Sequence, residues 1–292
     1  MASNAVNAAS EVPEEQAEGP VKAVYEDIKA TMRVPIVNLV FRVLATEPDF
    51  LKIAWRQLHP NAQTVYFEET AADIRRYAVE AVSRLGEKRT PVYGEEVGQV
   101  VRLFHYVNPK LLLTVAALRA SVNGQLPKVA ELSSYQKRQV APGVPDGMVV
   151  PHMVDPAGAD SRIQNLFADI NASTGATLVN SDYRALAQWP DFLEPAWHAW
   201  KPVLGTPDFI RLQRDLRRIA DDAAAMLPFR MEINPHSLRL CGLSEPQLDF
   251  VRATLDEFYR ILPGLVGNTA FLAIGIDGKA IASESPFPAT LA

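Results

Sequence analysis

Cysteine is almost absent from this sequence, since Cys241 is the single one in 292 residues. A lone cysteine cannot form an internal disulfide, and it excludes a CxxC redox motif or a metal site built from several thiolates. The five histidines lack the spacing of metal ligands, so no metal ion is expected. The absence of a disulfide framework is typical of a reducing compartment, and we therefore expect a cytoplasmic protein.

A basic surface and long apolar runs are lacking as well. The formal net charge is -5, with both signs interspersed along the chain, which argues against a nucleic-acid partner. The longest apolar run, LLLTVAAL at 111–118, is too short to cross a bilayer, which takes about 20 residues. The N-terminus has neither the charged nor the apolar region of a signal peptide. These absences predict a soluble protein without a membrane partner.

Motifs such as GxSxG, HExxH, the P-loop and GxGxxG are missing too. The sequence instead has helical periodicity, with apolar residues three and four positions apart and charged residues between them. TAADIRRYAVEAVSRL at 70–85 and RLQRDLRRIADDAAAML at 211–227 show it most clearly. Alternating strand patterns are scarce, so we predict an all-α fold.

An internal repeat organises the chain. Shifted by 142 residues, FRVLATEPDFLKIAWRQLHP at 41–60 aligns with YRALAQWPDFLEPAWHAWKP at 183–202, and ten of the twenty positions are identical. Further along, LFHYVNPKLLL at 103–113 aligns with EFYRILPGLVG at 257–267 at a shift of 154. Self-similarity of this length indicates two homologous helical units.

The repeat divides the chain into parts. We predict a flexible N-terminal tail at 1–19, a first helical repeat at 20–129, a linker at 130–157 and a second helical repeat at 158–292. Either repeat alone would expose an apolar face, so the two are expected to pack as a pseudo-dimer with a shared interface that contains the active site.

The repeat is broken at a few positions where one copy is polar and the other apolar. Asp182 aligns with Val40, and its neighbour Ser181 aligns with Leu39. Asn108 has an apolar counterpart too, because at the shift of 154 it aligns with Leu262. Burying a carboxylate costs several kcal/mol unless it is compensated, so such positions tend to be retained for chemistry. These breaks make Asp182 and Asn108 the candidate catalytic residues.

Helix capping is the structural alternative for both residues. Asp182 lies at the start of a helix opened by Asn180 or Ser181, where acids interact favourably with the helix dipole. Asn108 directly precedes Pro109, which is the pattern of an N-cap followed by proline in the first turn. The repeat weakens this explanation, because the other copy begins the same helix with Val40 and no acid.

Five segments carry a resemblance to a known family: TMRVP, RVLATEPDFL, VNPKLLL, SDYRALAQWPDFL and SPFP. They span the chain from about Tyr25 to Pro288, and in combination they resemble the group I 2-haloacid dehalogenases. The resemblance implies an all-helical pseudo-dimer, no cofactor, a homodimer in solution, and a small-molecule 2-haloacid and water as reactants. It also implies that Asp182 and Asn108 are catalytic.

The resemblance further implies which residues surround the substrate. The implied substrate-binding positions are Ser181, Asn180, Tyr183, Ile36, Leu39, Leu111 and Tyr259. Ile36, Leu39 and Leu111 are positions that are often aromatic in the family, so the fit of the substrate is expected to differ. Thr64 and Glu68 fall where some members have polar residues tied to activity, and they are expected in a second layer around the site or simply at the surface.

The implied reaction is hydrolysis of short 2-haloalkanoic acids, such as 2-chloropropionate, to 2-hydroxy acids with inversion at C2. Asp182 would activate the attacking water, with no ester intermediate. Asn180 stands where relatives that accept both enantiomers tend to have a small residue, which favours a D-preferring enzyme over a DL-acting one. Its match with Asn38 leaves a plain capping role open.

Two other functions are compatible with the residues. A cofactor-free decarboxylase or hydratase of small acids would use the same base on another substrate, and a non-catalytic helical protein would only hold a ligand at the interface. Release of halide from 2-chloropropionate distinguishes all three.

Overall fold

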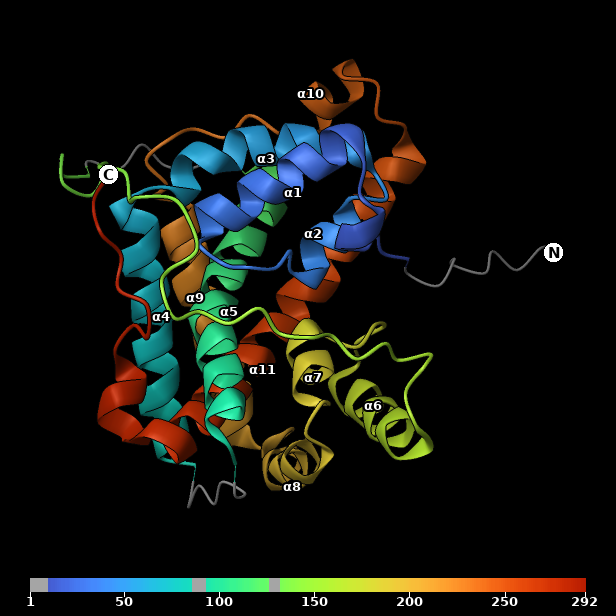
Figure 1. The fold of residues 1–292 in the computed structure, drawn as a ribbon. Coiled ribbons are helices and arrows are strands. Elements are labelled where there is room, and N and C mark those ends of the chain that lie inside the picture. The colour runs from blue at the N-terminus through green and yellow to red at the C-terminus, as the bar shows by residue number, and fades with distance from the viewer. Residues whose placement is uncertain (1–9, 86–92, 126–131) are drawn as a thin grey trace.

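The computed structural model describes residues 10–85, 93–125 and 132–292. Within these ranges the chain forms eleven α-helices, two short 3-10 helices and no β-strand beyond two isolated bridges. The predicted all-α fold is therefore confirmed (Figure 1).

The helices of the two halves follow each other in the same order. The first half contains α1 (Gly19–Met32), α2 (Leu39–Leu44), α3 (Pro48–Ala62), α4 (Val65–Ser83) and α5 (Glu95–Val122). The second contains α6 (Ser161–Thr174), α7 (Ser181–Leu186), α8 (Pro190–Trp200), α9 (Pro207–Ala224), α10 (Pro235–Leu240) and α11 (Glu245–Ser283). Helices α6 to α9 each begin 142 residues after α1 to α4, which is the shift of the sequence repeat.

Matching side chains stabilise matching helices. The Trp55 indole donates to Asp27 at 2.6 Å, and the Trp197 indole donates to Asp169 at 2.8 Å, so each pair ties the first helix of its half to the third. Thr64 caps the start of α4 through its hydroxyl, as its counterpart Thr206 caps α9. The repeated sequence therefore folds into repeated local structure.

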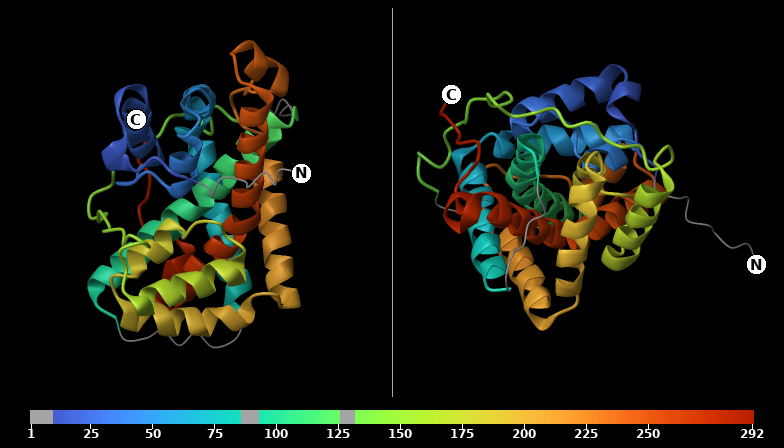
Figure 2. Two further views of the ribbon diagram at one scale, coloured as in Figure 1. Left: turned by 90° about the vertical axis from the view of Figure 1, so that its right-hand side faces the viewer. Right: turned by 60° about the horizontal axis from the view of Figure 1, so that its bottom comes forward.

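The two longest helices, α5 and α11, lie at the centre and pack against each other. Helices α1 and α3 lie at one end of the molecule and α6 to α8 at the other, with α5 and α11 between them (Figures 1 and 2). Helix α11 is long and apolar enough to cross a bilayer by length and composition, but 67% of its apolar window is buried inside the protein. Most of this apolar stretch is therefore part of the protein core.

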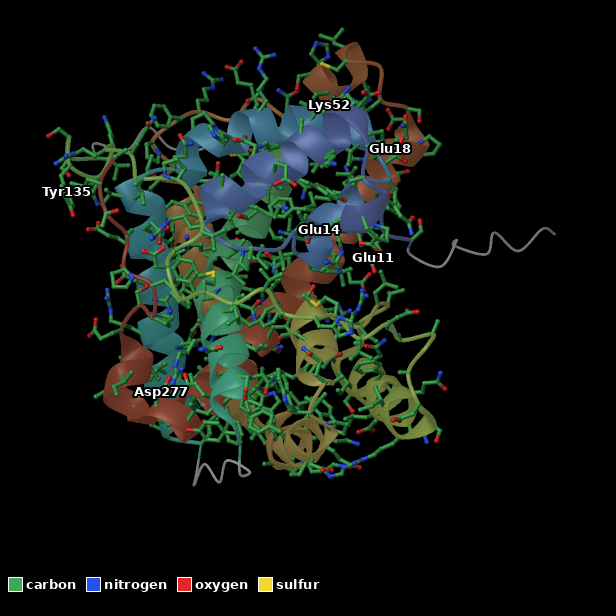
Figure 3. The ribbon with its side chains drawn as sticks, viewed as in Figure 1. Glu11, Glu14, Glu18, Lys52, Tyr135 and Asp277 are labelled. Carbon is green, nitrogen blue, oxygen red and sulfur yellow. The ribbon has the colours of Figure 1, made fainter. Side chains whose placement is uncertain are left out.

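The N-terminal segment differs from the predicted flexible tail of residues 1–19. Residues 1–9 lie outside the described ranges, but residues 10–17 pack on the protein and include a 3-10 helix, Glu14–Gln16. Glu11 pairs with both Arg42 and Arg184, and Glu14 accepts the backbone amide of Val37 at 2.6 Å. Figure 3 shows both glutamates beside α2. The charge of two largely buried arginines holds this segment in place, which composition alone does not reveal.

The described part of the predicted linker, 132–157, crosses the molecule as an extended segment between the two halves (Figure 1). Its backbone contacts both halves, since the amide of Val65 donates to Arg138 and the amide of Val154 donates to Arg184.

Candidate active site

The site lies where the short helix of each half packs against the long helix of the other half. Helix α7 of the second half packs against α5, and α2 of the first half packs against α11. Asp182 is the second residue of α7, and Asn108 lies in the middle of α5. Because α7 packs on the long helix of the first half, the side chains of Asp182 and Asn108 reach one cavity between the halves.

The cavity is small and lined mostly by helix residues. Its volume of about 20 Å³ is enough to hold a water molecule. Its walls are Asn38, Leu39, Val40, Phe104, Asn108, Leu111, Asn180, Ser181, Asp182, Phe258, Leu262 and Leu265.

These twelve residues form six pairs of counterparts in the sequence repeat. The shift of 142 pairs Asn38 with Asn180, Leu39 with Ser181 and Val40 with Asp182. The shift of 154 pairs Phe104 with Phe258, Asn108 with Leu262 and Leu111 with Leu265. Such pairing results when a cavity lies on an axis that relates two repeats. Three pairs have the same residue in both halves, and the other three are polar on one side only.

The carboxyl group of Asp182 is buried, with 2% of the residue exposed. Its Oδ1 accepts the backbone amide of Tyr183 at 3.0 Å, whereas Oδ2 has no protein partner. Burial raises the pKa of this carboxyl to about 7, although the backbone amides of Tyr183 and Asp182 and the side chain of Asn108 partly oppose the shift. Asp182 is therefore a much stronger base than an ordinary aspartate and can exchange a proton near neutral pH.

Unpartnered polar atoms gather around the same cavity. Among the described residues, twelve buried side-chain nitrogen or oxygen atoms have no protein partner, and five of them belong to residues that line it. These are Asn38 Oδ1, Asn108 Nδ2, Asn180 Nδ2, Ser181 Oγ and Asp182 Oδ2. Because buried polar groups are normally hydrogen-bonded, such a cluster indicates a binding site for water or a polar ligand.

Capping does not explain Asn108. It lies inside α5, which runs without interruption from Glu95 to Val122, so the alternative of an N-cap is wrong. Pro109 follows inside the helix and leaves the carbonyl of His105 without its helical amide. The buried Arg75 guanidinium donates to that carbonyl at 3.2 Å, which allows the proline to stay in the helix and Asn108 to face the cavity.

Capping does not explain the two asparagines either. Asn38 and Asn180 occupy the N-cap positions of α2 and α7, but neither side chain makes a capping hydrogen bond. Their side-chain amides contribute to the walls of the cavity instead.

The residues named from the sequence fall into two groups. Asn180, Ser181, Leu39 and Leu111 line the cavity together with Asp182 and Asn108. Ile36, Tyr183 and Tyr259 do not.

These three side chains are held elsewhere. Ile36 is buried before α2. Tyr183 lines a larger neighbouring cavity, and its hydroxyl accepts from Asn268 at 3.2 Å. Tyr259 lies under the guanidinium of Arg119, and its hydroxyl donates to Asp221. This arrangement holds it away from Asp182.

The two residues expected in a second layer also lie outside the cavity. Thr64 is fully buried and caps α4, accepting the amide of Phe67 at 3.2 Å. Glu68 forms an ion pair with the buried Lys110, and both contact the hydroxyl of Tyr106. Lys110 is two residues from Asn108 on α5, so this network borders the site through the helix rather than through the cavity.

The lining residues that were not predicted as site residues are Asn38, Val40, Phe104, Phe258, Leu262 and Leu265. The repeat contains the signal for them, since Asn38 is the counterpart of Asn180 and Leu265 that of Leu111. Phe104 and Phe258 lie one helical turn before Asn108 and Leu262 and are counterparts of each other. Among the described residues, no group of three or more His, Cys, Asp or Glu side chains has a metal-binding arrangement.

Similar proteins agree over nearly the whole chain. The family model "Halocarboxylic acid dehydrogenase DehI" matches residues 35–140. The (R)-2-haloacid dehalogenase of Pseudomonas putida is 31% identical over 272 residues, which covers 88% of this chain and 89% of that protein. A configuration-inverting 2-haloacid dehalogenase of Alcaligenes xylosoxydans xylosoxydans is 30% identical over 284 residues, covering 92% and 94%. The solved structure of a D-2-haloacid dehalogenase mutant with D-2-CPA has a TM-score of 0.86 at 29% identity, covering 91% of this chain and 95% of that one.

Proposed function

Since this chain belongs to the 2-haloacid dehalogenase family, a family of hydrolases that act on carbon–halide bonds, we propose that Asp182 is the base of its reaction. The enzyme hydrolyses 2-haloalkanoic acids to 2-hydroxy acids. The observation that carries the role of Asp182 is its buried carboxyl, with Oδ2 unpartnered in a water-sized cavity and a pKa raised to about 7.

The chemistry needs few groups. Asp182 takes a proton from a water molecule as the water oxygen attacks C2 of the substrate. The new C–O bond forms on the side opposite the halogen, and the C–X bond breaks so that halide leaves with its electron pair. Halide is a stable anion and needs no general acid. Asn108 orients the water through its side-chain amide, whose Nδ2 is free of protein partners.

The handedness of the reaction follows relatives named for it. Two of them are called configuration-inverting, and attack opposite the halogen inverts C2. Others are called (R)-2-haloacid dehalogenases. We propose that this enzyme prefers the D enantiomer, because the side chain of Asn180 occupies space at the cavity that a smaller residue would leave open.

Inversion alone does not establish the role of Asp182, since an aspartate that attacked C2 directly would also invert it. The alternative forms an ester, which water then cleaves at the carboxyl carbon. A second base normally activates that water, and the described residues lining the cavity contain no other acid or histidine. The arrangement therefore favours direct attack by water.

A single turnover in H2-18O, with enzyme in excess over 2-chloropropionate, distinguishes the two routes. Direct attack places 18O in the 2-hydroxy acid during the first turnover. The ester route delivers an unlabelled oxygen from Asp182 and leaves 18O in the protein. Unlabelled product would contradict the general-base role, while chloride release would still report dehalogenation. Product incubated with enzyme in H2-18O is the control for exchange.

We also propose that the two halves form a pseudo-dimer whose axis passes through the active site. The equal starts of the matching helices and the six pairs of counterparts around the cavity support it. Superposition of residues 20–129 on 158–292 tests it.

We further propose that this soluble enzyme is cytoplasmic and forms a homodimer. The exposed free thiol of Cys241 suits a reducing compartment. The family resemblance supports the homodimer, and light scattering on the purified protein measures its mass in solution.

A further inference from the structure

A second and larger cavity, called here the Gly264 cavity, adjoins the active site. Its volume is about 290 Å³, close to the lower limit for small-molecule pockets, and it opens to the surface of the second half. Asn180 and Leu265 line both this cavity and the one that contains Asp182. Only these side chains are shared, so they form the partition between the two spaces.

The Gly264 cavity has apolar walls. Trp200 and Phe209 form an edge-to-face pair with ring centroids 5.9 Å apart, and Leu204 and Ile261 complete the apolar lining. Polar groups such as Gln213 and the exposed Arg260 also line it, and Arg260 donates to the backbone carbonyls of Thr174 and Gly175. An apolar interior with exposed polar groups suits a hydrocarbon chain that extends towards solvent.

The two halves differ sharply at this place. The counterpart of Gly264 is Lys110, which is 1% exposed and whose ammonium donates to the carbonyl of Met32 at 3.1 Å. Met32 is the counterpart of Thr174, which lines the Gly264 cavity. The lysine chain therefore runs through the part of the first half that corresponds to open space in the second. Glycine at 264 keeps that space open.

The active-site cavity has too little room for the whole substrate. Its volume is about 20 Å³, room for a water molecule, whereas a 2-haloalkanoate adds a carboxylate, a halogen and an alkyl chain. A further cavity beside Thr177 shares Asn180, but its volume is also about 20 Å³. The Gly264 cavity is large enough for several methylenes, and the Asn180 side-chain nitrogen that separates it from Asp182 has no protein partner to hold it.

We propose that the Gly264 cavity binds the alkyl chain of the substrate beyond C3, so that the enzyme acts on 2-haloalkanoates longer than propionate. This inference rests on the proposed function, because it takes C2 to lie at Asp182. The carboxylate and halogen stay on the Asp182 side of Asn180, while the chain passes between Asn180 and Leu265 onto the aromatic wall. Tyr183, the next residue after Asp182, then lies along the chain rather than at C2.

Filling the cavity tests the proposal. Gly264→Met introduces an unbranched side chain that is one atom shorter than that of Lys110 and carries no charge, and Gly264→Ala adds a single methyl group. A Cβ at this helical position meets Phe209 Cζ at 3.5 Å and Gln213 Nε2 at 3.6 Å, which is ordinary contact, so the alanine variant should fold. The longer methionine side chain can enter the cavity of about 290 Å³, so the methionine variant should fold as well. Ala120→Met is the matched control. It narrows a cavity of about 220 Å³ that shares no lining residue with the active site.

The readout is bromide release from 2-bromopropionate, 2-bromobutanoate and 2-bromohexanoate. We expect kcat/KM of the wild type to rise about twofold to fourfold per methylene. Gly264→Met should lower the ratio of hexanoate to propionate at least about tenfold, with propionate turnover within about twofold. Gly264→Ala should lie between, and Ala120→Met should change neither value. An unchanged ratio in Gly264→Met, or an equal loss for all three substrates, would overturn the proposal.

Binding of unreactive alkanoates separates this proposal from the proposed function. Calorimetry with propionate, hexanoate and octanoate should show tighter binding of the longer chains to wild type, and the gain should vanish in Gly264→Met. If no haloacid releases halide but this pattern holds, the function is wrong and the cavity assignment stands. If halide is released but chain length leaves binding unchanged, the cavity assignment is wrong and the function stands.

Discussion

Val40 and Asp182 occupy matching positions in two six-residue helices that begin 142 residues apart, and both face the same cavity. One half puts an apolar side chain there and the other an acid. Asn108 and Leu262 repeat the contrast on the two long helices, with the polar residue now in the first half. The two residues of each pair lie at the same position of matching helices and are equally buried. They therefore differ only in the chemistry of their side chains. The first half thus serves as an internal control for the second.

The same contrast recurs next to the site. Lys110 fills space in the first half and Gly264 leaves it open in the second. The two halves also retain matched structure away from these cavities, as the Trp55 and Trp197 hydrogen bonds show. The proposed catalytic residues, Asp182 and Asn108, therefore lie where the two halves differ.

The largest expected effect comes from removing the carboxyl group of Asp182, which the first half lacks at the matching position. Asp182→Asn keeps the shape of the side chain but cannot accept a proton, and we expect kcat/KM for 2-chloropropionate to fall about a thousandfold. Chloride release measures the loss, and circular dichroism checks the fold. Asp191→Asn, which changes an exposed acid on the next helix, is the control and should keep full activity. Retained activity in Asp182→Asn would show that another group is the base.

The carboxyl group of Asp182 also makes the folding stability of the protein depend on pH. Burial raises the pKa of Asp182 from 3.8 to about 7, so the folded protein holds a proton that the unfolded chain releases between these values. Stability therefore falls as pH rises from about 4 to 7 and levels off above, by up to about 4 kcal/mol. Asp182→Asn lacks this penalty.

Urea unfolding of both proteins between pH 4 and 8 measures the effect. Asp182→Asn should match the wild type near pH 4 and become more stable towards pH 8. A constant difference across this range would mean that Asp182 titrates at its ordinary pKa.

Most of the fold could be predicted from the sequence because the repeat and the helical periodicity depend on local patterns. The segments 41–60 and 183–202, which match in sequence, cover most of α2 and α3 and of their counterparts α7 and α8, and Asp182 and Asn108 lie where the repeat breaks. Half of the cavity wall follows from the other half by the shifts of 142 and 154.

What the sequence missed depends on contacts between distant segments. Tyr259 was expected in the pocket, but Asp221 and Arg119 hold it elsewhere. The composition of residues 10–17 suggested a flexible tail, and nothing local reveals that Glu11 pairs with two arginines, one from each half. The Gly264 cavity has no signal in the sequence beyond a glycine aligned with a lysine.

The second pair in which one half is polar and the other apolar is Asn108 and Leu262, and it is tested by placing the apolar residue in the first half. Asn108→Leu introduces the residue of Leu262, and we expect kcat/KM to fall about a hundredfold because no side chain then orients the water. Stability should be unchanged or higher, since Asn108 Nδ2 is buried without a protein partner.

The reverse exchange, Leu262→Asn, is the matched control for polarity in the same cavity. It should not restore activity to Asn108→Leu unless the two positions are interchangeable across the axis. Full activity of Asn108→Leu alone would remove Asn108 from the reaction.

The asparagine pair offers a finer test, because here the two halves have the same residue. Asn180→Ala should raise turnover of the L enantiomer relative to the D enantiomer of 2-chloropropionate about tenfold, since space opens beside Asp182. Asn38→Ala removes the same side chain from the other wall of the cavity and should shift the ratio much less. Equal turnover of both enantiomers by the wild type would contradict the assigned D preference.

The weakest expected effect concerns the contact that ties the two halves together outside the cavity. Glu11 accepts from Arg42 at 2.5 Å and from Arg184 at 2.7 Å, and these arginines are counterparts that lie within the two short helices, α2 and α7. Glu11→Gln removes the charge they share, and we expect about 1 kcal/mol lower stability with activity within about threefold, because α7 stays packed on α5.

Urea unfolding measures the change, with the exposed Glu15→Gln as control. The loss should change little in about 1 M salt, because largely buried pairs are screened much less than exposed ones. A loss that exceeded the Asp182 effect would place the link between the halves in this ion pair rather than in the helices.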